Sequence, residues 1–223
     1  MDELTLDQLF ESLGTKGVLK QTIYRNTLDA FESICRQAER IVSDWNALGK
    51  EDLQVEYTRT GPFHSEMVFA GDALVFLMHT NVFEFSRDHE VMRTSYIRED
   101  KERSYCGIIH IYNFLADSFR YNRDNDLGYL IGRVFVNKDR HYFIEGKREV
   151  GILYPNFGKA VLDDSAAENI VKSAMQYAIS FDLLTPPYEE VKMLTAGAVR
   201  NYAESFRMVT AKRLGFRFQA DNS

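Results

Sequence analysis

Hydrophobic residues recur at helical spacing through the first 49 residues of the chain. Thr5 and Gln8 have the spacing of a capping box, and Gly14 is placed to end the short helix that they begin. After a break at residues 14–17, a second helix of about 28 residues, roughly 42 Å long, is predicted to end at Gly49. Its apolar positions alternate between spacings of four and three: Tyr24, Leu28, Phe31, Cys35, Ala38, Val42 and Trp45.

The length of this helix leaves two interpretations open. The helix packs along the whole length of a sheet, with its apolar stripe facing one core. Alternatively, part of the stripe pairs with a second subunit, because a regular four-three spacing is the spacing of coiled-coil seams. The second interpretation predicts a homodimer or a larger homo-oligomer.

The hydrophobic period changes from helical to two between residues 53 and 154, which predicts a sheet. Gly61-Pro62 and Gly71-Asp72 mark tight turns, and residues 137–140 join two strands in a hairpin. Residues 105–121 form an extended segment long enough to require a bulge or a bend. The region predicts about six or seven strands, and their short connections make neighbouring strands antiparallel.

Two further segments complete the predicted sheet region. Charged residues from Arg87 to Arg103 mark an exposed excursion between strands, with Val91 and Tyr96 as its anchors. Residues 150–154 are predicted to add a last short strand before Pro155. The strand that begins at Ala73 is apolar on both faces, so we expect it to lie inside the sheet and to be covered on both sides.

The last third of the chain is helical again. Ser165 and Glu168 form a second capping-box signal, and Thr185 with Pro186 begins a final helix that Gly215 is expected to stop. No linker or repeat separates the parts. We therefore predict a single α+β domain over residues 1–223, with a helical part at 1–49, an antiparallel sheet at 53–154 and a helical part at 165–215.

Composition and charge narrow the classes of function. The net charge of −6 and the isoelectric point near 5.5 argue against a nucleic-acid-binding protein. The first ten residues lack the pattern of a signal peptide, and no stretch approaches the ~18 apolar residues of a membrane helix. Cys35 and Cys106 lie in different predicted elements, so the chain is expected in a reducing cytoplasm, with no membrane partner.

Motifs for catalysis, metal binding and cofactor binding are absent from the sequence. Gly158-Lys159 lacks the other residues of a phosphate-binding loop, and the five histidines have no zinc-ligand spacing. Cys106 and His110 share one face of a strand but lie roughly 13 Å apart, too far for direct proton transfer. No catalytic residue, metal ligand or cofactor is predicted.

One polar group of residues is the candidate ligand site. It combines histidine, a carboxylate, arginine and tyrosine in and after the extended segment and in the strands expected beside it: His110, Tyr112, Asp117, Arg120, Tyr121, Arg123, Arg133 and His141. Arginines that converge beside tyrosines suit an anionic ligand, because the guanidinium fork matches carboxylate or phosphate. The alternative is that these residues form cross-strand pairs on the solvated face of the sheet.

Three classes of function follow. The leading hypothesis is a non-enzymatic binding module, a homodimer, that takes a small molecule or a peptide at the cleft between the sheet and the helices. The second is a structural or assembly protein that oligomerises through the long N-terminal helix. The third is an enzyme that uses the region of His110, Asp117 and Arg120 on an anionic substrate.

Overall fold

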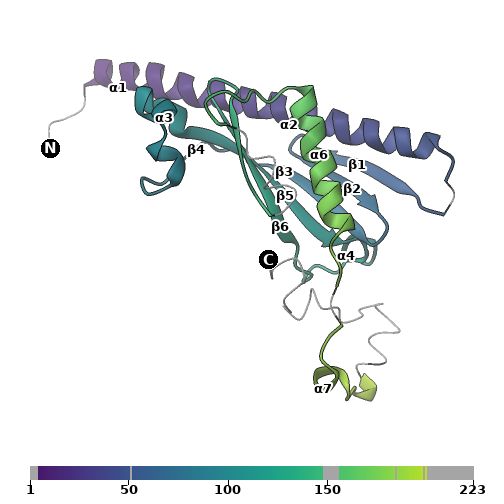
Figure 1. Ribbon diagram of the computed structural model, residues 1–223. Coiled ribbons are helices and arrows are strands. Elements are labelled where there is room, and N and C mark those ends of the chain that lie inside the picture. The colour runs from purple at the N-terminus through teal and green to yellow at the C-terminus, as the bar shows by residue number, and fades with distance from the viewer. Residues whose placement is uncertain (1–4, 51, 148–155, 184, 198, 200–223) are drawn as a thin grey trace.

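The fold is α+β, with helices packed on an antiparallel sheet of seven strands (Figure 1). The computed structural model describes residues 5–50, 52–147, 156–183, 185–197 and 199. The strand order is β1-β2-β3-β5-β6-β7, and β4 pairs with β5 outside this path. The strands are β1 (Val55–Gly61), β2 (His64–Phe69), β3 (Asp72–Met78), β4 (Phe83–Glu84), β5 (Tyr105–Leu115), β6 (Tyr129–Asn137) and β7 (Tyr142–Gly146).

Two helices cover the same face of the sheet. The long helix α2 runs across the strands, and α6 crosses the sheet beside it (Figure 1). The α-helices are α1 (Leu6–Ser12), α2 (Val18–Ala47), α3 (Ser95–Glu99), α4 (Ala116–Arg120), α6 (Asp164–Ile179) and α7 (Tyr188–Val191). A π-helical turn, Leu13–Gly17, joins α1 to α2, and the 3₁₀ turns Glu90–Arg93 and Lys101–Ser104 flank α3.

The break predicted at residues 14–17 is wrong, because the chain stays helical from Leu6 to Ala47. Glycine weakens a helix by about 1 kcal/mol relative to alanine but keeps its backbone N–H, so Gly14 and Gly17 can stay within the helix. The π turn absorbs one extra residue there, as π-bulges do. The predicted ends are confirmed: Thr5 and Gln8 form the capping box, and Gly49 follows the helix with a φ of 64°.

The main core lies between the sheet and the two helices. Alternate residues of the central strands point toward α2, as the period of two requires. The largest fully buried side chains of the protein include Phe31 of α2, Phe76 of β3 and Ile109 and Ile111 of β5. From α6, Ile170, Val171 and Ala174 close the same core. The predicted apolar stripe of the long helix is therefore its buried face.

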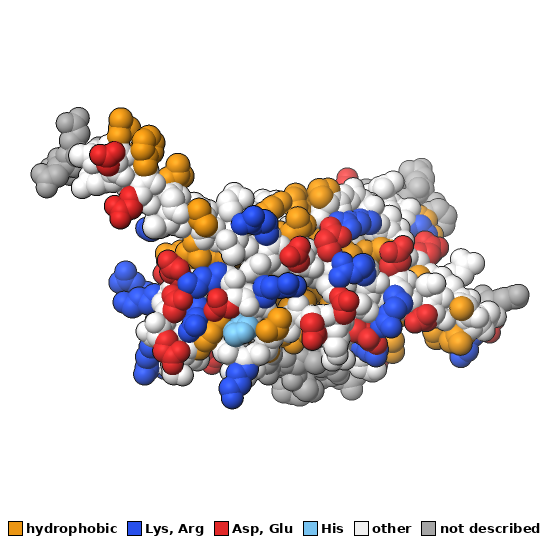
Figure 2. Space-filling view, turned by 90° about the horizontal axis from the view of Figure 1, so that it is seen from above, with side chains coloured by type: hydrophobic (Ala, Val, Ile, Leu, Met, Phe, Trp, Pro, Cys, Tyr) orange, Lys and Arg blue, Asp and Glu red, His pale blue; other side chains and the backbone are white. Residues whose placement is uncertain are grey.

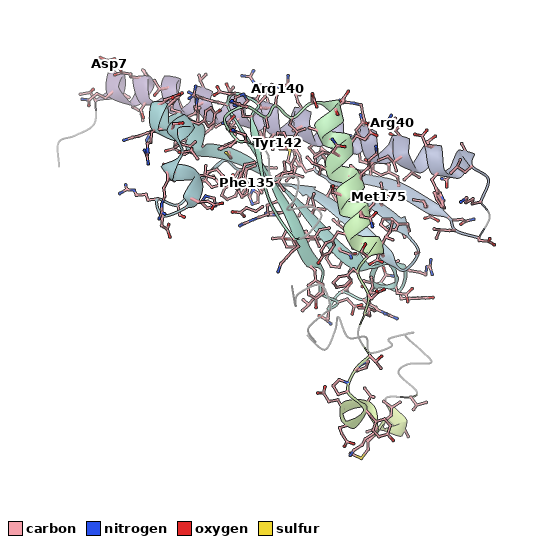
Figure 3. The ribbon with its side chains drawn as sticks, viewed as in Figure 1. Asp7, Arg40, Phe135, Arg140, Tyr142 and Met175 are labelled. Atoms are coloured by element: carbon pink, nitrogen blue, oxygen red, sulfur yellow. The ribbon has the colours of Figure 1, made fainter. Side chains whose placement is uncertain are left out.

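A second, smaller core lies on the other face of the sheet. The charged excursion folds back over β5, β6 and β7 there, with Val91 and Ile97 buried against the strands. Phe135 of β6, labelled in Figure 3, belongs to this cluster together with Phe85 and Phe143. The strand that was expected to be covered on both faces, β3, is buried at five of its seven positions.

The extended segment predicted for residues 105–121 is confirmed only in part. β5 ends at Leu115, and the expected irregularity lies between Ile111 and Tyr112. Residues Ala116–Arg120 form the short helix α4 instead. Leu115 pairs with Asp72, the first residue of β3, so the strand has no partner beyond this point. A helical turn then satisfies the backbone groups locally.

Two details of the C-terminal part also differ from the prediction. Helix α6 is capped by Asp163, whose carboxylate accepts the N–H of Ala166 at 2.8 Å, and not by Ser165. The predicted final helix is interrupted among its described residues: Tyr188–Val191 forms the short helix α7, residues 192–195 are not helical, and residues 196, 197 and 199 are helical again. The rest of it, from residue 200, and the predicted strand at 150–154 lie outside the described residues.

Candidate functional site

An apolar cleft of about 670 Å³ opens where α2 and α6 diverge over the edge of the sheet. One wall belongs to the C-terminal turns of α2 and the segment that follows, and the other to the end of α6, where Figure 3 labels Met175. The turn between β2 and β3 forms the floor. The described lining residues are Ile41, Asp44, Trp45, Leu48, Leu53, Val55, Phe69, Ala70, Asp72, Met175, Ala178, Ile179, Phe181 and Asp182.

The first wall follows from the way α2 ends. Ile41, Trp45 and Leu48 lie three and four residues apart, so they share one face of the helix. After Gly49 reverses the chain, two hydrogen bonds hold the returning segment against the helix. The indole Nε1 of Trp45 donates to the carbonyl of Leu53 at 3.0 Å, and Asn46 Nδ2 donates to the carbonyl of Val55 at 3.1 Å. These two bonds fix the part of the wall that the returning segment forms.

The second wall combines buried and exposed apolar groups. Ala178 is fully buried against the core, whereas Ile179 is 63% exposed and Leu48, across the cleft, is 64% exposed. Phe181 stacks on Tyr177 with a ring-centroid distance of 5.8 Å. The cleft therefore presents apolar side chains to water on a preformed support. Such concave, mostly apolar sites are where small molecules bind.

Three carboxylates lie among the lining residues, and they come from different elements: Asp44 from α2, Asp72 from β3 and Asp182 from the segment after α6. The described lining residues include no lysine, arginine or histidine. Lys50 lies nearby with its ammonium 5.3 Å from the centroid of the Trp45 ring. The cleft is accordingly apolar inside and acidic in its charged groups.

The eight residues predicted to bind a ligand fall into three separate groups. His110, Tyr112 and Arg133 share the face of the sheet that points away from α2. His110 pairs with Arg133 in register, and its ring lies 5.8 Å from that of Tyr112. Burial, and less strongly the positive charges of Arg133 and His79, lower the pKa of His110. The predicted common face of His110 and Tyr112 is present in the structure.

The second group lies at the far end of β5, in and after α4. Asp117 and Arg120 pair on the surface of the helix at 3.8 Å. Tyr121 follows, and its ring lies 5.5 Å from the guanidinium of Arg123. The Arg123 side chain is buried beside Asp126, so it lies inside the loop and not on the surface. This group is separated from His110 by roughly 16 Å of strand, at 3.3 Å per residue.

His141 stands apart at the other end of the hairpin. It follows the turn at residues 137–140, and its ring lies 5.3 Å from that of Tyr96 in the excursion. Figure 3 labels Arg140 and Tyr142 on either side of it in the sequence. The structure therefore does not bring the eight predicted residues together in one place.

Two polar residues that the sequence analysis missed complete the first group. Glu145 of β7 lies opposite Arg133 and forms an ion pair with it, and its other oxygen is 2.8 Å from Nε2 of His89. The predicted hairpin could not reveal this pair, because a four-residue turn at 137–140 places Ile144 opposite Arg133, whereas the register of the structure is shifted by one residue and places Glu145 there. The Arg133–Glu145 pair is the cross-strand pairing expected on an antiparallel sheet.

The described residues give little support to a metal site, a reactive thiol or a membrane-spanning helix. They contain no group of three or more His, Cys, Asp or Glu side chains placed to hold a metal ion. Cys35 and Cys106 are buried free thiols, and burial raises the pKa of Cys106 well above its ordinary value. Within the described part of the chain, no helix is long and apolar enough to cross a membrane.

Comparison of the chain with protein-family models, with curated proteins and with solved structures found no match.

Proposed function

We propose that this protein is a non-enzymatic binding module that takes a small apolar molecule in the cleft between α2, α6 and the sheet. The apolar cleft of about 670 Å³ carries the proposal. Its volume falls in the range of about 300–1,000 Å³ that is typical of ligand sites. A bound molecule would remove Leu48 and Ile179 from water, which is favourable by about 25 cal/mol per Å² of apolar surface.

The fluorescence of a tryptophan in the cleft can report ligand binding. Trp45 is the single tryptophan of the sequence, and it lines the cleft. Titration with N-phenyl-1-naphthylamine, a neutral apolar dye that accepts energy from tryptophan, is expected to quench the emission of Trp45 saturably. Replacing Ile179 by Lys should weaken dye binding about tenfold, since burying an isoleucine contributes about 1.5–3 kcal/mol and 1.4 kcal/mol is a factor of ten.

The matched control is Leu127→Lys. Leu127 is 67% exposed, as Ile179 nearly is, but it lies in the loop before β6, away from the cleft lining. This variant should bind the dye like the unmodified protein, and both variants should fold because both positions face water. Quenching that never saturates, or equal affinity in all three proteins, would rule the cleft out as the binding site.

A second candidate function is self-assembly through the start of the long helix, and a specific observation favours it. α1 has no buried residue, and it projects beyond the body of the protein with hydrophobic side chains on its surface (Figure 2). Leu6, Leu9, Phe10 and Leu13 are between 46% and 68% exposed. Contiguous exposed apolar surface of this kind marks interaction sites.

A second copy of this chain is the partner that we propose for α1. Asp7 and Glu11 lie in the first turns of the helix, and Lys16 and Lys20 follow further along. In an antiparallel pair of helices, the acidic turns lie level with the basic turns of the other copy, whereas parallel pairing sets like charges side by side. Attraction between charges of opposite sign therefore favours the antiparallel arrangement over the parallel one.

Light scattering after size exclusion tests this assembly. We expect a dimer at ~100 µM protein, where an interface with micromolar Kd is largely occupied. Leu13→Lys should give a monomer, because it places a charge in the seam of both copies, and Leu127→Lys should remain dimeric. A monomeric unmodified protein at this concentration would exclude the assembly function but leave the cleft proposal intact.

The compartment proposed for both functions is the cytoplasm. Cys35 and Cys106 are buried thiols, which suits a reducing environment. Nucleic acid is not among the proposed partners, because the net charge is −6. An enzyme acting through His110, Asp117 and Arg120 finds no geometric support, since His110 lies in a separate group from the Asp117–Arg120 pair.

A further inference from the structure

The charged residues that line the cleft indicate which charge its ligand carries. Asp44, Asp72 and Asp182 come from three different elements and border the same apolar space. Asp44 and Asp182 are exposed, so both carboxylates are in water beside the opening. Two exposed carboxylates from different parts of the chain therefore stand at the border of the apolar interior.

No positive charge lines the described part of this space. At its edge, the ammonium of Lys50 lies over the ring of the lining residue Trp45. Lys50 shows that this ring accepts a cation on its face, as tryptophan does most readily among aromatic side chains. Inside a concave site with apolar walls, charges of one sign reinforce each other and concentrate ions of the opposite sign.

We propose that the cleft selects cationic amphiphiles, small molecules that combine an alkyl or aromatic body with one positively charged nitrogen. The body fills the apolar space between Trp45 and Ile179, and the cation lies beside Asp44 and Asp182 at its border. This inference rests on the binding function proposed above and adds the charge of the ligand to it. Anionic amphiphiles with the same body are rejected by the same carboxylates.

Three probes with one alkyl chain separate charge from apolar binding: decyltrimethylammonium, decanol and decanoate. All are titrated as monomers against the emission of Trp45 in the full chain. The cation is expected to bind at least about tenfold more tightly than decanoate, with decanol between them. The preference should shrink at 1 M salt, where the screening length is about 3 Å, compared with about 10 Å at 0.1 M.

A charge-removing variant locates the preference in the cleft. Asp44→Asn with Asp182→Asn should lower the affinity for decyltrimethylammonium about fivefold or more and leave the affinity for decanol unchanged. Both residues are exposed, so the fold should persist. Asp7→Asn is the matched control, because Asp7 lies on the projecting α1, far along the helix from the cleft (Figure 3). It should bind all three probes like the unmodified protein.

The outcomes distinguish this inference from the binding function. Equal affinity for the cation and for decanol overturns the charge selection but leaves an apolar binding module. Tighter binding of decanoate than of the cation also overturns it. Failure of all three probes, and of the neutral dye, to change Trp45 emission overturns both the charge selection and the proposed binding function. A cation preference that the double variant abolishes supports both.

Discussion

Replacing Asp126 by Ala is expected to lower the free energy of unfolding by about 3–5 kcal/mol, since the change leaves a buried arginine without its counter-charge. The side chains of Arg123 and Asp126 are each only 3% exposed. Nη1 of Arg123 lies 3.9 Å from Oδ2 of Asp126, and the hydroxyl of Ser118 donates to the same oxygen at 2.9 Å. Urea denaturation followed by circular dichroism measures the loss.

A double replacement separates the charge effect from packing. Arg123→Met with Asp126→Leu removes both charges and keeps apolar volume, so it should recover most of the stability that Asp126→Ala loses. Apolar replacement of a whole buried pair is often neutral or stabilising. A cost of less than about 1 kcal/mol for the single Asp126→Ala variant would contradict this prediction and would show that the charge of Arg123 does not depend on Asp126.

The fold was predictable where one periodicity persists over many residues. The change from helical period to a period of two near residue 53, and back after residue 160, follows the change from helix to sheet and back. The hairpin around residues 137–140 was equally clear, because its turn is local. The predictions of a helix break at Gly14 and of extended backbone at Ala116–Arg120 were wrong. At both places the local sequence has only a weak preference, and contacts with neighbouring elements determine the structure. α4 forms because β5 has no partner residue in β3 beyond Leu115, and no local sequence pattern reveals where that pairing ends.

The candidate sites were less predictable. Alternation along a strand correctly placed His110 and Tyr112 on one face, but it could not relate them to Asp117 or His141, which depend on where β5 ends and how the hairpin turns. The cleft has no sequence motif at all. It exists because α2 and α6 diverge beyond their contact, which leaves Leu48 and Ile179 in water. An apolar residue that lines a cleft has the same sequence signature as one in the core.

The second large effect concerns the contact between the long helix and the sheet. Gly107→Ala is expected to destabilise the protein by about 3 kcal/mol, the upper end of the usual cost of overpacking. A Cβ atom at Gly107 would lie 2.8 Å from Cβ and Cγ2 of Thr27 and closer still to its hydroxyl. Thr27 is fully buried, and its hydroxyl donates to the carbonyl of Ile23 at 2.7 Å, so it has no room to move.

A double-mutant cycle shows whether this contact is the cause. Thr27→Gly alone should cost about 1 kcal/mol for the helix, yet in that background Gly107→Ala should cost less than about 1 kcal/mol, because the clashing atoms are gone. Gly61→Ala in β1 is the control, since a Cβ there meets nothing within 4 Å, and it should stay within about 0.5 kcal/mol. Additive effects of the two changes would mean that α2 does not approach β5 at this point. The cycle therefore tests the position of the long helix on the sheet, and with it the wall of the cleft that the same helix builds.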